Sequence, residues 1–186
     1  MSRLTSMSAN ALKAVFSPDS DSDLITLLTI YDPVNTNNIL ARISDGYTTR
    51  ISENANEVLY GVTRTVPVNP QDPQGPQEIQ NFIFLPVQIT LPSEEEAQAP
   101  RCSLSISDVT RYLTPIIRNL QEPPRVKLEL ILNKSPYVSE ISFDYLYISN
   151  ISYNRDVVNC DLTMINLERE PFPLHSFTPA NFPGLF

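Results

Sequence analysis

The feature that most constrains the fold is a change of hydrophobic period within residues 101–132. Residues 101–107 alternate apolar and polar side chains, which is the pattern of a strand with one buried face. The next apolar residues instead follow the spacing of one helical face: Val109, Tyr112, Leu113, Ile116, Ile117 and Leu120. Two prolines at 123–124 end this segment, and residues 126–132 return to a period of two. A helix that interrupts a run of strands must bury its apolar face on their sheet.

Other segments predict strands on both sides of this unit. Residues 24–31 are apolar at almost every position, which predicts a strand covered on both faces. Further predicted strands lie at residues 39–43, 47–51, 58–62, 82–91, 141–153 and 158–164, with Asp45-Gly46 as a hairpin turn. In the longest of them, Ile141, Phe143, Tyr145 and Tyr147 share one face and Ile151 and Tyr153 continue its phase. Residues 5–16 predict a short helix with Leu12, Val15 and Phe16 on one face.

Roughly nine or ten strands and two helices predict a β-dominated α+β fold. We expect one domain over residues 1–186, built as an antiparallel sheet, a sandwich or a partly open barrel. One short amphipathic helix packs on it, and the N-terminal helix is short too. The 17 prolines against four glycines predict long, shaped connections. Residues 65–80 are predicted to form a proline-rich loop, and residues 170–186 an extended C-terminal arm.

Charge and hydropathy exclude several classes of partner. With 13 basic and 21 acidic residues the formal charge is −8, which disfavours both nucleic acid and an anionic membrane surface. The longest apolar run, near residues 24–30, is too short to span a membrane. No signal-peptide pattern opens the sequence, so we expect synthesis in a reducing cytoplasm. Cys102 and Cys160 occupy apolar positions of alternating runs and are predicted to be free, buried thiols.

The sequence contains no recognisable catalytic or metal-binding motif. His175 is the single histidine and lies among the prolines of the C-terminal segment, without a supporting Ser-His-Asp or Cys-His pattern. The four glycines are scattered, unlike those of a phosphate-binding loop. The two cysteines are too far apart for a zinc site. We therefore expect no catalytic residue, no cofactor and no metal, and a chain that is not an enzyme.

Glu94, Glu95 and Glu96 form the one acidic cluster. Three adjacent carboxylates without alternating Asp, Asn and Gly residues make a poor calcium loop. The cluster is either a solvated loop between two strands or a contact with a basic partner.

The C-terminal segment carries apolar side chains that cannot all stay in water. Its candidate anchors are Phe172, Phe177, Phe182, Leu185 and Phe186, and four prolines limit the entropy lost when such an arm is ordered. Two interpretations stay open at this point. The rings pack back on their own domain, or they bury against a neighbouring subunit, which is the interpretation we favour.

Several blocks of the sequence resemble an uncharacterised-domain family of tailed-bacteriophage tail proteins. They are DGYTTRISE (45–53), VLYGVT (58–63), the long block FIFLPVQITLPSEEEAQAPRCSLSISDVTRYLTPIIR (82–118), YNRD (153–156), LEREPFP (167–173) and FPGLF (182–186). The likeness covers nearly the whole chain from about residue 9, with residues 65–80 resembling an insertion. More distantly, the layout is similar to the N-terminal part of phage lambda minor tail protein L.

The resemblance implies a virion protein of the tail tip, or baseplate, of a long-tailed phage, made in the host cytoplasm. Its partners would be other tail-tip proteins, namely a tube-side ring and a central hub or fibre protein. It would form a homo-oligomer, a trimer or a hexamer, as part of a ring between the tail tube and the receptor-binding hub. The alternative is a tail assembly factor or binding module that is absent from the mature virion. The family supplies no catalytic residues.

Overall fold

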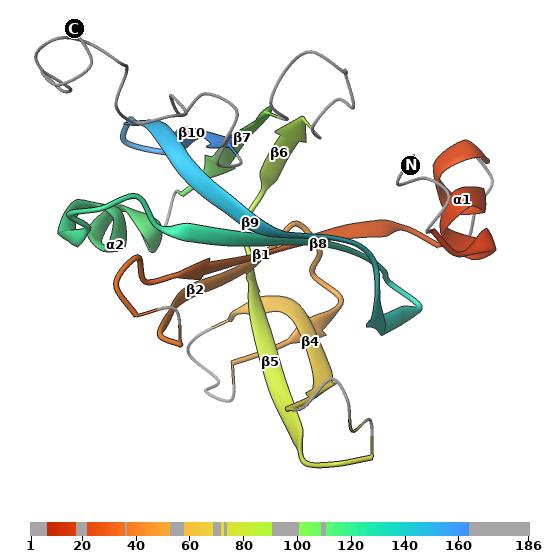
Figure 1. Ribbon diagram of the computed structural model, residues 1–186. Helices are drawn as coiled ribbons and strands as arrows, with labels where there is room; N and C mark the ends of the chain where they lie inside the picture. The colour runs from red at the N-terminus through yellow and green to blue at the C-terminus, as the bar shows by residue number, and fades with distance from the viewer. Residues whose placement is uncertain are drawn as a thin grey trace, which may run out of the picture.

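The computed structural model describes residues 7–17, 22–35, 37–52, 58–68, 72, 74–90, 101–108 and 111–163 of the 186 residues. Within these ranges, ten strands form one mixed sheet and two short helices lie against it (Figure 1). The predicted β-dominated α+β class is therefore confirmed.

The helices are α1 (Ala9–Phe16) and α2 (Leu113–Asn119). The strands are β1 (Leu24–Tyr31), β2 (Ile39–Ser44), β3 (Thr49–Arg50), β4 (Tyr60–Pro67), β5 (Gln77–Phe84), β6 (Val87–Thr90), β7 (Arg101–Ser107), β8 (Arg125–Leu132), β9 (Ser135–Tyr153) and β10 (Val157–Thr163). Their order in the sheet is β3-β4-β5-β2-β1-β8-β9-β10-β7-β6. The β2–β5 pair is parallel, and the other neighbouring strands of the described sheet run antiparallel.

Strands β1 and β8 lie at the centre of the sheet and are covered on both faces. Six consecutive residues of β1 are buried, as its uninterrupted apolar run predicted. Leu28 and Ile30 face the larger core, whereas Ile25 and Leu27 face a second, smaller core. The centre of the sheet therefore separates two cores.

The larger core lies between the sheet and α2, as the change of period predicted. Cys102, Leu104 and Ile106 point into it from β7, and Leu113 of α2 is also buried there. The N-terminus of α2 is held by Asp108, whose carboxylate accepts hydrogen bonds from the backbone N–H groups of residues 112, 113 and 114. This buried carboxylate satisfies donors that the first helical turn leaves without a partner.

The second core forms because the sheet curls. Strand β4 lies against β9, although the two strands are not hydrogen-bonded neighbours. The sheet therefore encloses an incomplete barrel, which consists of the six strands β4, β5, β2, β1, β8 and β9. Its packed end consists of Ile25, Leu27, Val62, Phe82 and Ile131.

The register of strand β9 is irregular at several positions, and the alternation predicted for it is wrong. One irregularity separates Phe143 from Leu146, which are both buried, so the phase moves away from Tyr147. Another lies near Asn150, whose φ of 50° is in the left-handed region. Each extra residue shifts the period-two pattern by one position, which hydrophobic spacing alone does not reveal.

One predicted turn and one predicted loop also differ from the structure. Asp45-Gly46 is not a hairpin turn, because β3 pairs with β4 and not with β2. Asp45 instead holds the chain to β1: its Oδ1 accepts a hydrogen bond of 2.7 Å from the N–H of Thr26. The predicted loop at residues 65–80 is shorter than expected, since Pro67 and Gln77 are paired as the ends of β4 and β5. The β4–β5 hairpin projects from the body of the molecule (Figure 1).

The strand predicted at residues 82–91 is divided by Leu85 and Pro86. β5 pairs with β2 and β4, whereas β6 pairs with β7 at the opposite end of the sheet. The N–H of Leu85 donates to Ser44, and the carbonyl of Pro86 accepts from Ser107, so these two residues connect the two regions.

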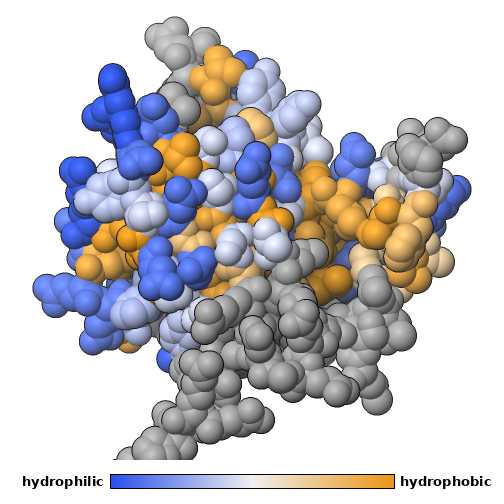
Figure 2. All heavy atoms as spheres, turned by 90° about the horizontal axis from the view of Figure 1, so that it is seen from above, coloured by the Kyte–Doolittle hydropathy of each residue, from blue (hydrophilic) through white to orange (hydrophobic). Residues whose placement is uncertain are grey.

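Helix α1 packs on the ends of β1 and β8 through a face that differs from the predicted one. Ala11 is buried against Met7 and Leu132, and Leu12 packs on this cluster. Val15 and Phe16 are exposed, Phe16 by 72%. Figure 2 shows apolar atoms gathered at the α1 end of the molecule.

Candidate functional site

The contact residues predicted from the sequence lie outside the described residues. Glu94, Glu95 and Glu96 belong to residues 91–100. The C-terminal anchors Phe172, Phe177, Phe182, Leu185 and Phe186, together with His175, belong to residues 164–186. The cavities and charged groups of the described residues therefore supply the candidate sites.

The two cysteines are free and buried, as predicted. Burial, with a smaller effect from Asp161, raises the pKa of Cys102 to about 11 and that of Cys160 to about 12. A thiol that stays protonated at neutral pH is a poor nucleophile and a poor metal ligand. The cysteines therefore act as small apolar residues of the larger core.

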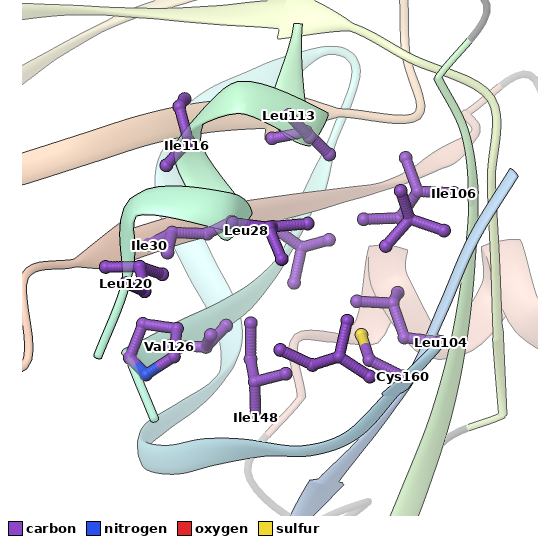
Figure 3. A pocket seen from close by; sticks show the side chains of 14 residues that line it. Leu28, Ile30, Leu104, Ile106, Leu113, Ile116, Leu120, Val126, Ile148 and Cys160 are labelled. Carbon is purple, nitrogen blue, oxygen red and sulfur yellow. The ribbon is translucent and has the colours of Figure 1, made fainter. Parts of the chain in front are cut away.

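The gap under α2 is a defect of packing rather than a binding site. Side chains from α2, including Leu113 and Ile116, converge on it from one side, and Leu28, Ile106 and Cys160 from the other (Figure 3). Its volume is about 20 Å³, which is the space of a single water. Because its walls are apolar, it offers a water no set of hydrogen-bond partners.

A polar groove of about 390 Å³ lies on the outer face of β6, β7, β9 and β10. Its lining is rich in hydroxyl and amide groups: Gln88, Thr90, Ser103, Ser105, Asn150, Ser152, Asn159 and Asp161. Asp161 already accepts hydrogen bonds from Ser103 and Asn150. The lining has no aromatic ring and no basic side chain, so it presents little beyond a solvated strand surface.

A second hollow of about 300 Å³ opens inside the incomplete barrel, next to its packed end. We call it the charged hollow. It is lined by Thr29, Tyr31, Ile39, Arg42, Arg64, Val66, Glu78, Gln80, Lys127, Glu129, Tyr137 and Ser139. These residues come from β1, β2, β4, β5, β8 and β9.

The floor of the charged hollow is an ion pair between Arg64 and Glu129. Nη2 of Arg64 lies 2.6 Å from Oε2 of Glu129, and both side chains are almost completely buried. Nε of Arg64 donates to Oε1 of Gln80 at 3.1 Å. The Ser139 hydroxyl donates to Oε1 of Glu129 at 3.0 Å. The polar floor therefore separates the hollow from Val62 and the rest of the packed end.

Lys127 and Arg42 form the walls. Nζ of Lys127 lies 3.4 Å from Oε1 of Glu129 and 3.3 Å from Oδ1 of Asp144. Burial lowers the pKa of Lys127, but the two carboxylates outweigh burial and hold it above 10.5. Nη2 of Arg42 lies 2.8 Å from Oε1 of Glu78, whereas its buried Nε has no hydrogen-bond partner among the described residues. Arg42 thus keeps donor capacity beyond its ion pair.

Two tyrosines complete the hollow. Tyr31 is half-buried, and its burial raises the pKa of its hydroxyl above 10.0. Tyr137 of β9 is 67% exposed, so its ring stands at the rim. The hollow therefore combines hydrogen-bond donors and acceptors with aromatic and aliphatic surface.

Sequence reasoning missed this site because its residues are spread over six strands. One local signal was present: in residues 125–132 the polar positions Lys127 and Glu129 alternate with leucines in a strand at the centre of the sheet. A buried strand whose second face carries charges needs polar partners on that face. Pairing Glu129 with Arg64, 65 residues earlier, required the curl of the sheet.

Within the described part of the chain, no helix is long and apolar enough to cross a membrane. No group of three His, Cys, Asp or Glu side chains there is placed to hold a metal ion. Comparisons with protein-family models, with curated proteins and with solved structures find no match to this chain.

Proposed function

We propose that this chain is a structural subunit of the tail tip of a long-tailed phage, forming part of a ring between the tail tube and the receptor-binding hub. The sequence blocks that resemble phage tail proteins suggest the setting. The observation that carries the proposal is the projecting β4–β5 hairpin and the apolar side chains that it presents to solvent.

The hairpin has the properties of an assembly arm. Ile79 on β5 is 66% exposed, and Val68, just after β4, is 64% exposed. Exposed apolar side chains on a projecting element are available to be buried by contact with another protein. The base of the hairpin is fixed by Phe82 and Val62 in the packed end of the incomplete barrel. A rigid base and an apolar outer part suit an arm that reaches a neighbouring copy.

An arm of this kind gives the contact that a ring needs. A ring of identical subunits uses heterologous contacts, in which one surface of a subunit meets a different surface of the next. The net charge of −8 also suits a component of a channel through which DNA passes, because it does not retain phosphates. The proposal assigns no chemical turnover to the chain.

Mass spectrometry of purified virions tests the setting. We expect peptides of this chain in the finished particle, and their absence would instead favour an assembly factor that leaves the tail.

The assembly arm is tested with Ile79→Asp, which places a charge on the hairpin at an exposed position. We expect a folded protein of unchanged stability and virions with incomplete tails. Val34→Asp, at an exposed position in the turn between β1 and β2, is the matched control and should support complete tails.

A further inference from the structure

The charged hollow has the size and position of a small-ligand site. Its volume of about 300 Å³ is at the lower end of the range of about 300–1,000 Å³ that ligand pockets cover. It opens within a barrel-like arrangement of strands, and barrel mouths are frequent places for ligands. The tail-tip proposal gives it no role.

The charges of the hollow argue against an ionic ligand. Arg42, Arg64 and Lys127 each lie within 3.4 Å of a carboxylate oxygen. An added anion would approach Glu78, Glu129 and Asp144, and an added cation would approach the three basic side chains. Either ion would have to compete with internal pairs, and a partner that loses its pair inside the hollow would be left buried and charged. A neutral ligand avoids this cost.

The polar groups that line the hollow suit a ligand that both donates and accepts hydrogen bonds. The hydroxyl groups of Thr29 and Tyr31 can act in both ways, and that of Ser139, which already donates to Glu129, can accept. Arg42 has donor capacity beyond its contact with Glu78, because a guanidinium group carries five N–H donors. Hydroxyl groups of a ligand can bond to such side chains without breaking their ion pairs.

The rim of the hollow supplies an apolar surface for the rest of the ligand. Tyr137 presents its ring at the rim, and Ile39 and Val66 contribute aliphatic surface. A pyranose ring has a face made of C–H groups and an edge made of hydroxyl groups. The C–H face suits an aromatic ring, which combines apolar area with a polar tip. A sugar placed against Tyr137 would direct hydroxyl groups towards Arg42 and the floor.

We infer that the charged hollow binds an uncharged sugar residue, with Tyr137 stacking on the C–H face of the ring and Arg42, Tyr31 and Gln80 bonding to its hydroxyl groups. This binding does not depend on the tail-tip assignment, because it rests on the hollow alone.

The test is a titration of the full chain with the methyl glycosides of glucose, galactose, mannose, rhamnose and N-acetylglucosamine, followed by saturation-transfer NMR and calorimetry. At least one of these neutral sugars should bind with a Kd of about 10 mM or tighter. In the Tyr137→Ala variant we expect binding to be at least about tenfold weaker, because the stacking surface is removed. Tyr60→Ala removes another exposed tyrosine, outside the hollow, and should leave the Kd within about twofold.

Circular dichroism and thermal unfolding establish that both variants are folded, so a loss of binding reports on the hollow. The inference is overturned if none of the five glycosides saturates, or if Tyr137→Ala binds as tightly as the unchanged protein. Acetate, glucuronate and glucosamine serve as ionic probes. Binding of one of these in place of the neutral glycosides would also overturn the inference and identify an ion site.

Discussion

The guanidinium group of Arg64 and the carboxylate of Glu129 form an ion pair of 2.6 Å that joins β4 to β8 across 65 residues of chain. The exposed fractions of the two side chains are 6% and 5%. The pair sits where the packed end of the incomplete barrel meets the charged hollow. The curl of the sheet brings β4 and β8 together at this point. Arg64–Glu129 is the only ion pair between these two strands in the described structure.

The first prediction concerns this pair. Arg64→Met should lower the free energy of unfolding by about 3–5 kcal/mol, because it leaves a buried carboxylate without its main partner. The double variant Arg64→Met, Glu129→Leu should be less destabilised than this single variant, since it removes both charges together. Urea unfolding at neutral pH measures both values. A loss below about 1 kcal/mol for Arg64→Met would show that the pair is solvated.

The second prediction concerns Asp108, which is 1% exposed and caps α2. Asp108→Ala should lower the free energy of unfolding by about 2–4 kcal/mol, because several backbone donors lose their buried acceptor. Asp156→Ala, in the exposed turn between β9 and β10, is the matched control and should change stability by at most about 0.5 kcal/mol. Equal effects in the two variants would mean that the cap contributes nothing beyond a surface charge.

Strands with a regular hydrophobic pattern were predictable, and the partners of each strand were not. The alternation around Leu104 and the two-sided apolar run around Leu28 gave β7 and β1 with their buried faces. The path of the chain at Asp45 and Pro86 was not predictable. Asp45 has a turn signature, but the hydrogen bond to Thr26 and the pairing of β3 with β4 decide its structure. Such contacts depend on residues outside the short segment that carries the turn signature.

The charged hollow was outside the reach of sequence patterns for a related reason. Arg42, Arg64 and Glu129 are ordinary strand positions until the sheet curls and places them on one inner surface. A site assembled from alternating positions of six strands has no spacing motif, unlike a metal or phosphate loop. Lys127 and Glu129 gave the one local signal, as charged residues in a strand at the centre of the sheet that needs cover on both faces.

The third prediction concerns the packing of α2 on the sheet. Leu113 is 1% exposed and its N–H donates to Asp108. Leu113→Asp should lower the free energy of unfolding by at least about 3 kcal/mol, because it places a charge in the larger core and next to another carboxylate. Asn119→Asp adds a charge at the exposed C-terminal residue of the same helix and should cost at most about 1 kcal/mol, because it opposes the helix dipole. An unchanged stability for Leu113→Asp would mean that this face of α2 meets solvent.

The fourth prediction concerns stability at alkaline pH. Two carboxylates hold the pKa of Lys127 above 10.5 in the folded protein despite its burial. The stabilisation that its charge gives is therefore complete below the unfolded pKa and is lost as the pH rises through the folded pKa. Tyr31, in the same hollow, also has a raised pKa, through burial. Its neutral form is favoured by folding, so it too makes stability fall above about pH 10.

The two contributions are separated in a background without the tyrosine hydroxyl. Tyr31→Phe should show a free energy of unfolding that falls between about pH 9 and pH 12, in part from Lys127. Tyr31→Phe, Lys127→Met should show a smaller fall over the same range, because no lysine charge remains to be lost beside Glu129 and Asp144. Urea unfolding at intervals across that range gives the two curves. Parallel curves would mean that the Lys127 charge is as well solvated in the folded protein as in the unfolded chain, and that the two carboxylates do not act on it.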